Sequence, residues 1–309
     1  MRVLITGSSG QIGTNLALAL LDRGDHVVGV DRRPNTWTSR IETVLLDLAR
    51  TGLDPLPGGD CFDVVVHLAA NAKVHELVEQ PQRAMDNITI CFAAMEHCRR
   101  HSLPLVFASS REVYGDIHRH VTREAEADFV VAESPYSASK IAGEALIYSY
   151  AQCYDLPFLV FRFSNVYGRY DNDLERMERV IPLFIDRIAR DLPITVFGRD
   201  KVLDFTYVDD CVAGVIAGID ALHQRRVTRE TVNLACGQGS TLVDVVNIVA
   251  LALRKQPKVA YEPARVGEVT RYVADISKAR ALLGYNPQTP LSTGLIKTVE
   301  WSASWRPIA

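Results

Sequence analysis

The feature that most constrains this chain lies at its start, where a short apolar run passes through three glycines into a helical stretch. The run Arg2–Thr6 is rich in β-branched residues, Gly7, Gly10 and Gly13 follow at three-residue spacing, and helical periodicity extends over 11–23. The first glycine permits a tight turn, the second lets a pyrophosphate approach, and the third lets the helix pack on the strand. Free N–H groups at the helix start attract phosphate. This order predicts a dinucleotide-binding unit.

A second expected strand, over 26–30, ends at Asp31. An acidic side chain at this point accepts hydrogen bonds from the adenosine ribose hydroxyls, which favours NAD over NADP. Arg32 is a weaker signal in the opposite direction, since an arginine here is able to meet a 2′-phosphate. Because Asp31 is the stronger signal, we predict NAD as the cofactor.

Strands alternate with helices through the first half of the chain. Further strands are expected over 41–46, 63–68 and 103–108, with a long helix over 81–100. This alternation predicts a Rossmann-type, doubly wound parallel sheet, whose ligands bind beyond the carboxyl ends of the strands. The pairs that follow the strands, and are expected to meet in one cleft, are Asp47-Leu48, Ala69-Ala70 and Ser109-Ser110.

Tyr136 and Lys140 stand four residues apart at the start of a segment with helical periodicity. This spacing places a phenol and an ammonium on one helix face, one turn apart. A nearby cation favours the phenolate, so the pair is able to take a proton from a hydroxyl near neutral pH. The same spacing also occurs on solvated helix surfaces, so the neighbouring motifs must decide between the two.

Composition argues against several other classes of protein. Lys and Arg number 34 against 37 Asp and Glu, and no basic block stands out, so we expect no nucleic-acid partner. No apolar run approaches the ~20 residues that cross a bilayer, and the chain opens directly on a strand, so we expect a cytoplasmic protein without a membrane partner. The six cysteines form no C-x-x-C pair or His/Cys cluster, which predicts free thiols and no metal site.

Taken together, the motifs resemble the extended short-chain dehydrogenase/reductases of the nucleotide-sugar epimerase/dehydratase group. The resemblance spans nearly the whole chain, and the motifs stand in the family's order. Besides the glycine loop and Asp31, they are Asp47-Leu48, His67-Leu68-Ala69-Ala70, Ser109-Ser110-x-x-Val113-Tyr114-Gly115, Tyr136-x-x-x-Lys140, Arg162-Phe163-x-Asn165-Val166-Tyr167-Gly168, Asp204-Phe205-x-Tyr207-Val208-x-Asp210 and Arg265-x-Gly267-Glu268. The resemblance implies a Rossmann domain over 1–168, to which about 202–236 returns, and a smaller, interleaved α/β substrate domain mainly over 169–309.

The resemblance also implies catalytic roles for three residues. Tyr136 takes the proton from a sugar hydroxyl, Ser110 hydrogen-bonds the same oxygen, and Lys140 holds the nicotinamide ribose and lowers the phenol pKa. Hydride passes to NAD and returns to the other face of the 4-ketone, so NAD stays bound through many cycles. The implied NAD contacts are Gly7, Gly10, Gln11, Ile12, Gly13, Asp31, Arg32, Asp47, Leu48, Leu68, Ala69, Ala70, Asn87, Ser109, Tyr136, Lys140 and Phe163.

Arg111 and Glu112, directly after Ser110, depart from the simplest epimerase pattern. Plain 4-epimerases mostly carry small residues there, 4,6-dehydratases resemble Asp-Glu, and UDP-glucuronate decarboxylases resemble Ser-Glu. Glu112 is thus a candidate catalytic base, but a cation replaces the acid that dehydration needs. Arg111 either faces a C6 carboxylate of the substrate or pairs with Glu112 or Asp116 at the rim.

The substrate side is assigned by the resemblance alone. Asn165 and Arg265 match positions that hold the diphosphate, while Ser110 and Arg111 are expected at the sugar. The residues in segments that enclose uracil are Val180, Thr195 and Phe197. The arginine that usually precedes Asp204 is Leu203 here, and Lys201 and Arg199 are candidate substitutes.

Two helical stretches, 81–100 and 139–154, carry apolar stripes that predict an interface between two subunits. The stripe residues are Ile88, Phe92 and Met95 in the first stretch, and Ile141, Ala145 and Tyr148 in the second. In relatives the equivalent helices form a four-helix bundle, which implies a homodimer. The alternative is that each stripe faces only its own sheet.

The leading hypothesis is therefore an NAD-dependent UDP-sugar 4-epimerase, with UDP-glucuronate and UDP-galacturonate as the preferred pair because Arg111 answers a carboxylate. One alternative is a UDP-glucose/UDP-galactose or N-acetyl-sugar 4-epimerase. Another is a decarboxylase or dehydratase that uses Glu112. A non-catalytic NAD-binding regulator is disfavoured, because Tyr136 and Lys140 are both present.

Overall fold

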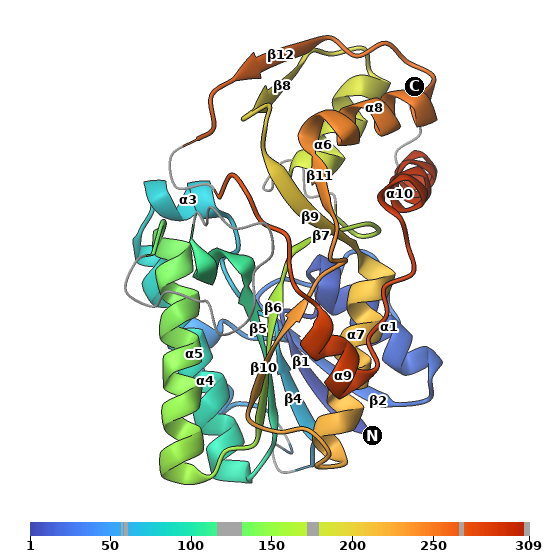
Figure 1. Ribbon diagram of the computed structural model, residues 1–309. Helices are drawn as coiled ribbons and strands as arrows, with labels where there is room; N and C mark the ends of the chain where they lie inside the picture. Colours follow the sequence, from blue (N-terminus) through green and yellow to red (C-terminus); the bar gives the residue numbers. More distant parts are fainter. Residues whose placement is uncertain (57, 59–60, 116–131, 172–178, 266–268, 306–309) are drawn as a thin grey trace.

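A seven-stranded parallel sheet forms the centre of the molecule (Figure 1), in the order β10-β6-β5-β4-β1-β2-β3. The computed structural model describes residues 1–56, 58, 61–115, 132–171, 179–265 and 269–305. The strands are β1 (Arg2–Thr6), β2 (His26–Asp31), β3 (Glu42–Leu45), β4 (Val64–His67), β5 (Leu105–Ser110), β6 (Phe158–Phe163) and β10 (Glu230–Leu234). The chain runs outward in opposite directions from β1 and β4, which confirms the predicted doubly wound fold and puts a crevice at their carboxyl ends.

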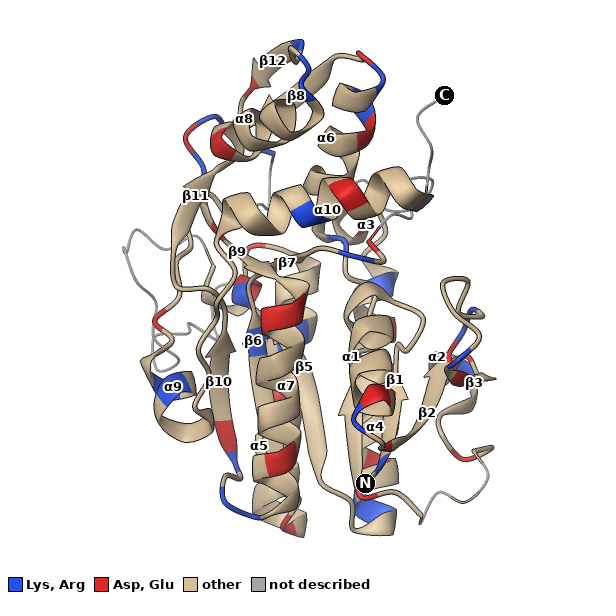
Figure 2. Cartoon of the chain, turned by 90° about the vertical axis from the view of Figure 1, so that its right-hand side faces the viewer, with Lys and Arg blue, Asp and Glu red and all other residues tan. Residues whose placement is uncertain are grey.

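Helices cover both faces of this sheet (Figure 1). The helices α1 (Gln11–Asp22) and α7 (Val208–His223) lie on one face, and α4 (Gln82–His101) and α5 (Pro135–Tyr154) lie on the other. Successive side chains of β1 enter different cores, Val3 and Ile5 on the α1 side and Leu4 on the α4 side, as a strand covered on both faces requires. Figure 2 shows few charged residues on the central strands.

The smaller part of the molecule lies beyond the carboxyl ends of these strands (Figure 1). Its three-stranded sheet has the order β11-β9-β7, and a separate pair joins β8 to β12. The strands are β7 (Asn165–Tyr167), β8 (Ile194–Phe197), β9 (Val202–Tyr207), β11 (Gly239–Thr241) and β12 (Val259–Glu262). The helices are α6 (Val180–Ala189), α8 (Leu242–Leu253) and α10 (Leu291–Trp305), while α9 (Ser277–Leu283) packs on α7 and β10. The division into domains at residue 168 stays a prediction.

The expected apolar stripes on α4 and α5 are wrong in part. Met95 and Ile141 are only 0% and 8% exposed, because both side chains join the core of their own subunit. Phe92 and Tyr148, in contrast, are 48% and 41% exposed. The exposed apolar face of this helix pair is therefore narrower than the sequence pattern suggests.

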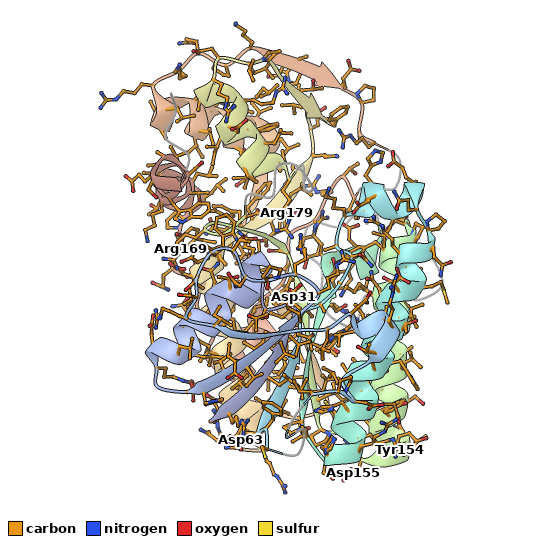
Figure 3. The ribbon with its side chains drawn as sticks, turned by 180° about the vertical axis from the view of Figure 1, so that it is seen from behind. Asp31, Asp63, Tyr154, Asp155, Arg169 and Arg179 are labelled. Carbon is orange, nitrogen blue, oxygen red and sulfur yellow. The ribbon has the colours of Figure 1, made fainter. Side chains whose placement is uncertain are left out.

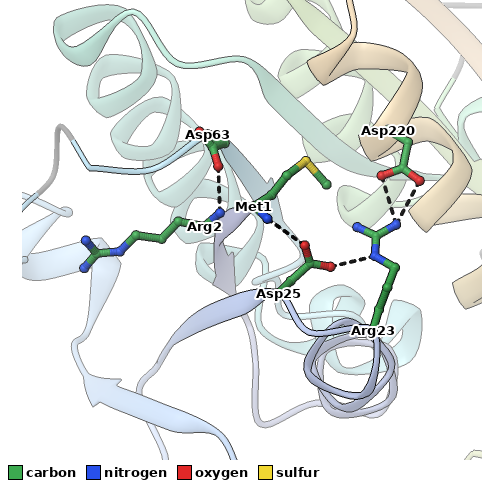
Figure 4. Close-up of polar contacts among 6 residues, drawn as sticks. All are labelled: Met1, Arg2, Arg23, Asp25, Asp63 and Asp220. Atoms are coloured by element: carbon green, nitrogen blue, oxygen red, sulfur yellow. Dashed lines mark hydrogen bonds and ion pairs between the residues drawn. The ribbon is translucent and has the colours of Figure 1, made fainter.

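A cluster of charged groups lies at the amino ends of the strands, opposite the crevice (Figure 4). The amino group of Met1 donates to Asp25 Oδ1 at 2.7 Å, and Arg23 Nε donates to Asp25 Oδ2 at 2.6 Å. Arg23 also binds both carboxylate oxygens of Asp220 on α7. Burial opposes ionisation of Asp25, but the hydrogen bonds from the amino group and Arg23 outweigh it and lower its pKa. This cluster joins the ends of β1, α1 and α7.

Among the residues that the structure describes, no helix is both long and apolar enough to span a bilayer. The same residues contain no group of three or more His, Cys, Asp or Glu side chains that could hold a metal ion. None of the six cysteines, all of which lie in the described part of the chain, forms a disulfide.

Candidate active site

The glycine loop after β1 forms a cradle that side chains would fill. Gly7 has a φ of 76°, and a Cβ added to it would lie 2.7 Å from the backbone nitrogen of Ala69. A Cβ on Gly13 would lie 2.2 Å from the Gly7 carbonyl oxygen. Gly10 caps α1 without a side-chain hydrogen bond, and no acidic residue occupies the first turn of this helix. The first N–H groups of α1 are thus available to bind a pyrophosphate. This open cradle is the structural feature that fits NAD.

Asp31 lies beside this cradle, at the carboxyl end of β2 (Figure 3). Its carboxylate accepts hydrogen bonds from the backbone nitrogens of Ser9 and Arg33, at 3.0 and 3.1 Å. These bonds fix the carboxylate next to the glycine loop, where the sequence predicts the adenosine ribose. Arg32 is exposed and donates to Asn71 Oδ1 at 3.3 Å, so its guanidinium also lies at this end of the site.

The other predicted cofactor residues follow the neighbouring strands. Asp47 caps the short helix α2 (Leu48–Thr51), and Leu68 and Ala69 approach Gly7. Asn87 on α4 is buried, and its amide binds the backbone of Asn71 and the hydroxyl of Ser139. Asn87 thus joins the loop after β4 to α5. Its contact with NAD stays a prediction, as do the NAD contacts of all the other predicted cofactor residues, including Ile12, Leu48, Ala70, Ser109 and Phe163.

The start of α5 places Tyr136 and Lys140 at the end of β5. Ser134 and Ser137 form a reciprocal capping box, and Pro135 occupies the first turn, which fixes where the helix begins. Tyr136 and Lys140 are buried, with exposures of 8% and 5%. Lys140 Nζ donates to the Ala108 carbonyl oxygen at 2.7 Å and lies 5.8 Å from the centre of the Tyr136 ring. The structure therefore brings the predicted pair together in one buried site.

The protein's own groups do not make this phenol more acidic. Burial raises the pKa of Tyr136 to about 12, against the lowering effects of the Ser110 hydrogen bond and of the charges on Arg179 and Arg111. Burial also lowers the pKa of Lys140 to about 8. The net effect on Tyr136 is opposite to the lowering that the Tyr–Lys pattern predicts, because the low-dielectric surroundings disfavour the phenolate.

Arg111 and Glu112 lie in a 3-10 turn (Arg111–Tyr114) that Ser110 caps by accepting a hydrogen bond from the Glu112 nitrogen. Arg111 Nη2 pairs with Glu112 Oε1 at 2.9 Å, and the two side chains are 12% and 6% exposed. Arg111 Nη1 is buried, and among the described residues it has no hydrogen-bond partner. The predicted salt bridge is thus present, and it leaves one guanidinium nitrogen unused. Asp116, the other suggested partner, lies outside the described residues.

The predicted nucleotide contacts gather in the smaller part of the molecule. The guanidinium of Arg265 lies 4.0 Å from the centre of the Phe197 ring, at the end of β8. Asn165 Nδ2 donates to the Asp204 carbonyl oxygen at 3.1 Å. Thr195 lies on β8 beside Phe197, and Val180 begins α6. Gly267 and Glu268, which complete the Arg265 motif, lie outside the described residues.

Leu203 is a core residue of β9, only 7% exposed, so it takes no part in binding a diphosphate. Of its candidate substitutes, Lys201 is buried, with its methylenes packed against Gly198. Arg199 is exposed and lies 5.0 Å from the centre of the Tyr261 ring. Neither geometry selects a replacement for the missing arginine.

Arg179 is a site residue that sequence reasoning missed (Figure 3). It precedes α6, donates to Gln11 Oε1 at 2.9 Å, and its charge acts on the pKa of Tyr136. It also forms an ion pair with the buried Asp171 at 3.5 Å. No motif marks Arg179, and the only signal is the charged run before the apolar Val180–Leu183 segment.

The parallel sheet, the glycine cradle and the buried Tyr136–Lys140 pair define a dinucleotide-dependent enzyme of the short-chain dehydrogenase/reductase class. Residues 3–235 match the model of the NAD dependent epimerase/dehydratase family, and the chain belongs to this family. Membership confirms the predicted family, its enzymatic character and NAD as the cofactor.

Similar proteins carry two kinds of name. An uncharacterized UDP-glucose epimerase of Bacillus subtilis is 30% identical over 98% of both chains. UDP-glucuronate 4-epimerase 1 of Arabidopsis thaliana is 31% identical over 98% of this chain and 77% of the relative. The solved structure of UDP-glucuronic acid 4-epimerase from Bacillus cereus, in complex with UDP-glucuronic acid and NAD, is 28% identical, with a TM-score of 0.90 over 99% of this chain and 100% of that one.

Proposed function

We propose that this protein is an NAD-dependent UDP-sugar 4-epimerase that prefers UDP-glucuronate and UDP-galacturonate. The observation that carries the substrate choice is the Arg111 guanidinium, whose buried Nη1 has no hydrogen-bond partner among the described residues. A buried donor without a partner is unfavourable, and a carboxylate at C6 of the sugar would satisfy it with a charge-assisted hydrogen bond. Relatives named for UDP-glucuronate support the same choice.

The residues at the end of β5 would handle the proton of the sugar hydroxyl. Tyr136 takes this proton at its phenol oxygen and returns it, Ser110 holds the same substrate oxygen, and Lys140 binds the nicotinamide ribose. When bound, NAD would supply a hydride acceptor and donor for C4 of the sugar, and inversion would require the 4-keto sugar to turn its other face to the cofactor before reduction. The positive nicotinamide ring would also favour the phenolate, which offsets the burial that raises the pKa of Tyr136.

The pairing of Glu112 disfavours the decarboxylase and dehydratase alternatives. Its carboxylate already binds Arg111 at 2.9 Å, and the Glu112 side chain is buried, with an exposure of 6%. A role as base toward the sugar would require this pair to open. Glu112 is therefore proposed to position Arg111 rather than to remove a proton.

The substrate preference is tested with Arg111→Gln, which removes the charge but keeps a polar partner for Glu112. We expect kcat/KM for UDP-glucuronate to fall roughly 10- to 100-fold, as the loss of one charge-assisted hydrogen bond predicts. The value for UDP-glucose should change little. The matched control Glu112→Gln keeps the guanidinium and an amide oxygen that still accepts a hydrogen bond from it, so this variant should keep the preference.

Equal losses on both substrates in Arg111→Gln would reject the carboxylate contact and favour a UDP-glucose 4-epimerase. Complete loss of turnover in Glu112→Gln would instead make Glu112 a catalytic base. Both variants are to be compared at saturating NAD, so that differences in cofactor content do not enter the ratio.

We also propose a homodimer built from α4 and α5. The two helices pack side by side on the outside of the sheet (Figure 1). Met85, Phe92 and Tyr148 are 54%, 48% and 41% exposed on them. Ala145 is also exposed on α5. Pairing this face with its own copy would bury these side chains in a four-helix bundle.

A further inference from the structure

Three aromatic side chains from distant parts of the chain meet beside the cofactor cradle. Trp37 belongs to the loop between β2 and β3, Tyr170 follows β7, and Trp301 belongs to α10. The ring centres of Trp37 lie 5.6 Å from Tyr170 and 5.5 Å from Trp301, and those of Tyr170 and Trp301 lie 5.6 Å apart. Each ring thus contacts both others at distances typical of favourable tilted pairs.

The loop that carries Trp37 is bound directly to the glycine loop. Asn35 Nδ2 donates to the Ser8 carbonyl oxygen at 3.2 Å and to Thr14 Oγ1 at 3.0 Å, while Asn35 Oδ1 accepts from the Trp37 nitrogen at 2.9 Å. Ser9 Oγ donates to the carbonyl oxygen of Arg33 at 2.9 Å. The Trp37 loop and the cradle for the pyrophosphate are therefore one unit.

The segment that carries Tyr170 is fixed to the same cradle from the other side. Gln11 and Asn15 on α1 donate to the carbonyl oxygens of Gly168 and Arg169, at 3.3 and 3.2 Å. Tyr170 itself has a φ of 61°, in the left-handed region that non-glycine residues seldom adopt. Such a conformation persists only where surrounding contacts hold it, and Trp37 and Trp301 are the contacts that face this ring.

We propose that Trp37, Tyr170 and Trp301 form an aromatic clasp that retains NAD. The clasp joins the adenosine side of the cradle to α10, so the Trp37 loop cannot move away from the cradle without separating the rings. The inference rests on the proposed function, because an epimerase regenerates its NAD in every cycle and does not need to release it. A clasp that slows release would therefore leave turnover unaffected.

The clasp is tested by loading purified protein with radiolabelled NAD and removing the free label by gel filtration. Excess unlabelled NAD is then added, and the label retained by the protein is followed with time. Trp37→Leu and Trp301→Leu should each release NAD roughly 10- to 100-fold faster than the native chain, as loss of two ring contacts suggests. Trp37→Phe keeps a ring, so its NAD release rate should lie between that of the native chain and that of Trp37→Leu. This variant also provides a test if a leucine variant does not fold.

The matched control is Tyr154→Leu, which removes an aromatic ring, 56% exposed, at the opposite edge of the sheet (Figure 3). It should release NAD at the native rate. Native release rates in folded clasp variants, checked by circular dichroism, would overturn the proposal. The measurement uses no sugar nucleotide, so absence of epimerase activity would reject the proposed function without affecting the retention result.

Discussion

His67, at the end of β4, is a buried titratable residue next to the site. It is 2% exposed, its Nδ1 lies 2.7 Å from Thr6 Oγ1, and its ring stacks on Phe107. Burial, assisted by the charge of Lys140, lowers the pKa of His67 to about 3. The folded protein therefore holds this imidazole neutral throughout the physiological range.

This neutral histidine predicts acid sensitivity. Between about pH 6.5 and pH 3 the imidazole binds a proton in the unfolded chain but not in the folded chain. The contribution of His67 to the free energy of unfolding is therefore fully present above pH 6.5 and is lost as the pH decreases through this window. When the pH is lowered from 7 to 4.5, the free energy of unfolding should therefore decrease by about 2–3 kcal/mol less in His67→Gln than in the native chain. Urea denaturation at both pH values measures the difference, and equal losses would mean that His67 does not titrate in this way.

Single residues differ in how far the sequence reveals them. Tyr136 and Lys140 were predictable because helical spacing alone fixes their relative position. Arg179 was not, since it reaches the site through a contact with Gln11, 168 residues away. The raised pKa of Tyr136 could not be predicted from the Tyr–Lys spacing either, because the burial that raises it depends on the complete fold.

At the scale of elements, a buried ion pair fixes the helix that carries the catalytic pair. Glu144 lies two turns after Tyr136 on α5 and accepts hydrogen bonds from Arg162 Nε at 3.0 Å and Nη2 at 2.7 Å. Ser109 Oγ donates to the same carboxylate at 2.5 Å. The two charged side chains are 0% and 2% exposed. This bidentate pair joins α5 to β5 and β6.

Removing one partner of this pair should be much more harmful than removing both. Glu144→Ala leaves a buried guanidinium without its counter-ion and should reduce the free energy of unfolding by about 3–5 kcal/mol. The double variant Glu144→Leu, Arg162→Met should recover much of this loss, because an apolar pair of similar volume replaces both charges. Urea denaturation checks both. A loss below about 1 kcal/mol in Glu144→Ala would show that the pair is not needed to hold α5.

The sequence predicted long, periodic elements better than short ones. The first five strands along the chain, β1 to β5, and the helix α4 were found within a few residues, since continuous apolar runs and helical periodicity mark them. The strands β7 and β11, three residues each, have no such pattern and form through pairing with β9. The stripe on α4 combined Phe92 with Met95, because a one-dimensional pattern does not show which face the sheet covers.

At the scale of the whole molecule, the proposed dimer predicts that a charge on the α4–α5 face separates the subunits. Phe92→Glu places a carboxylate at the centre of the bundle, where burial without a partner is unfavourable. We expect light scattering after gel filtration to give the dimer mass for the native chain and the monomer mass for this variant. Leu251→Glu, at a leucine that is 80% exposed on α8, is the matched control. A native monomer at micromolar concentration would contradict the proposal.

The central claim is that the chain inverts C4 of a UDP-uronate by removing and returning the same hydrogen. The most direct measurement is proton NMR of purified protein with UDP-glucuronate in D2O, without added NAD. The proposed mechanism predicts that UDP-galacturonate accumulates to an equilibrium mixture, with protium kept at both C4 and C5, and that Tyr136→Phe loses roughly 10²- to 10⁴-fold in rate. A UDP-pentose, a persistent 4-keto sugar or deuterium at C5 would contradict it.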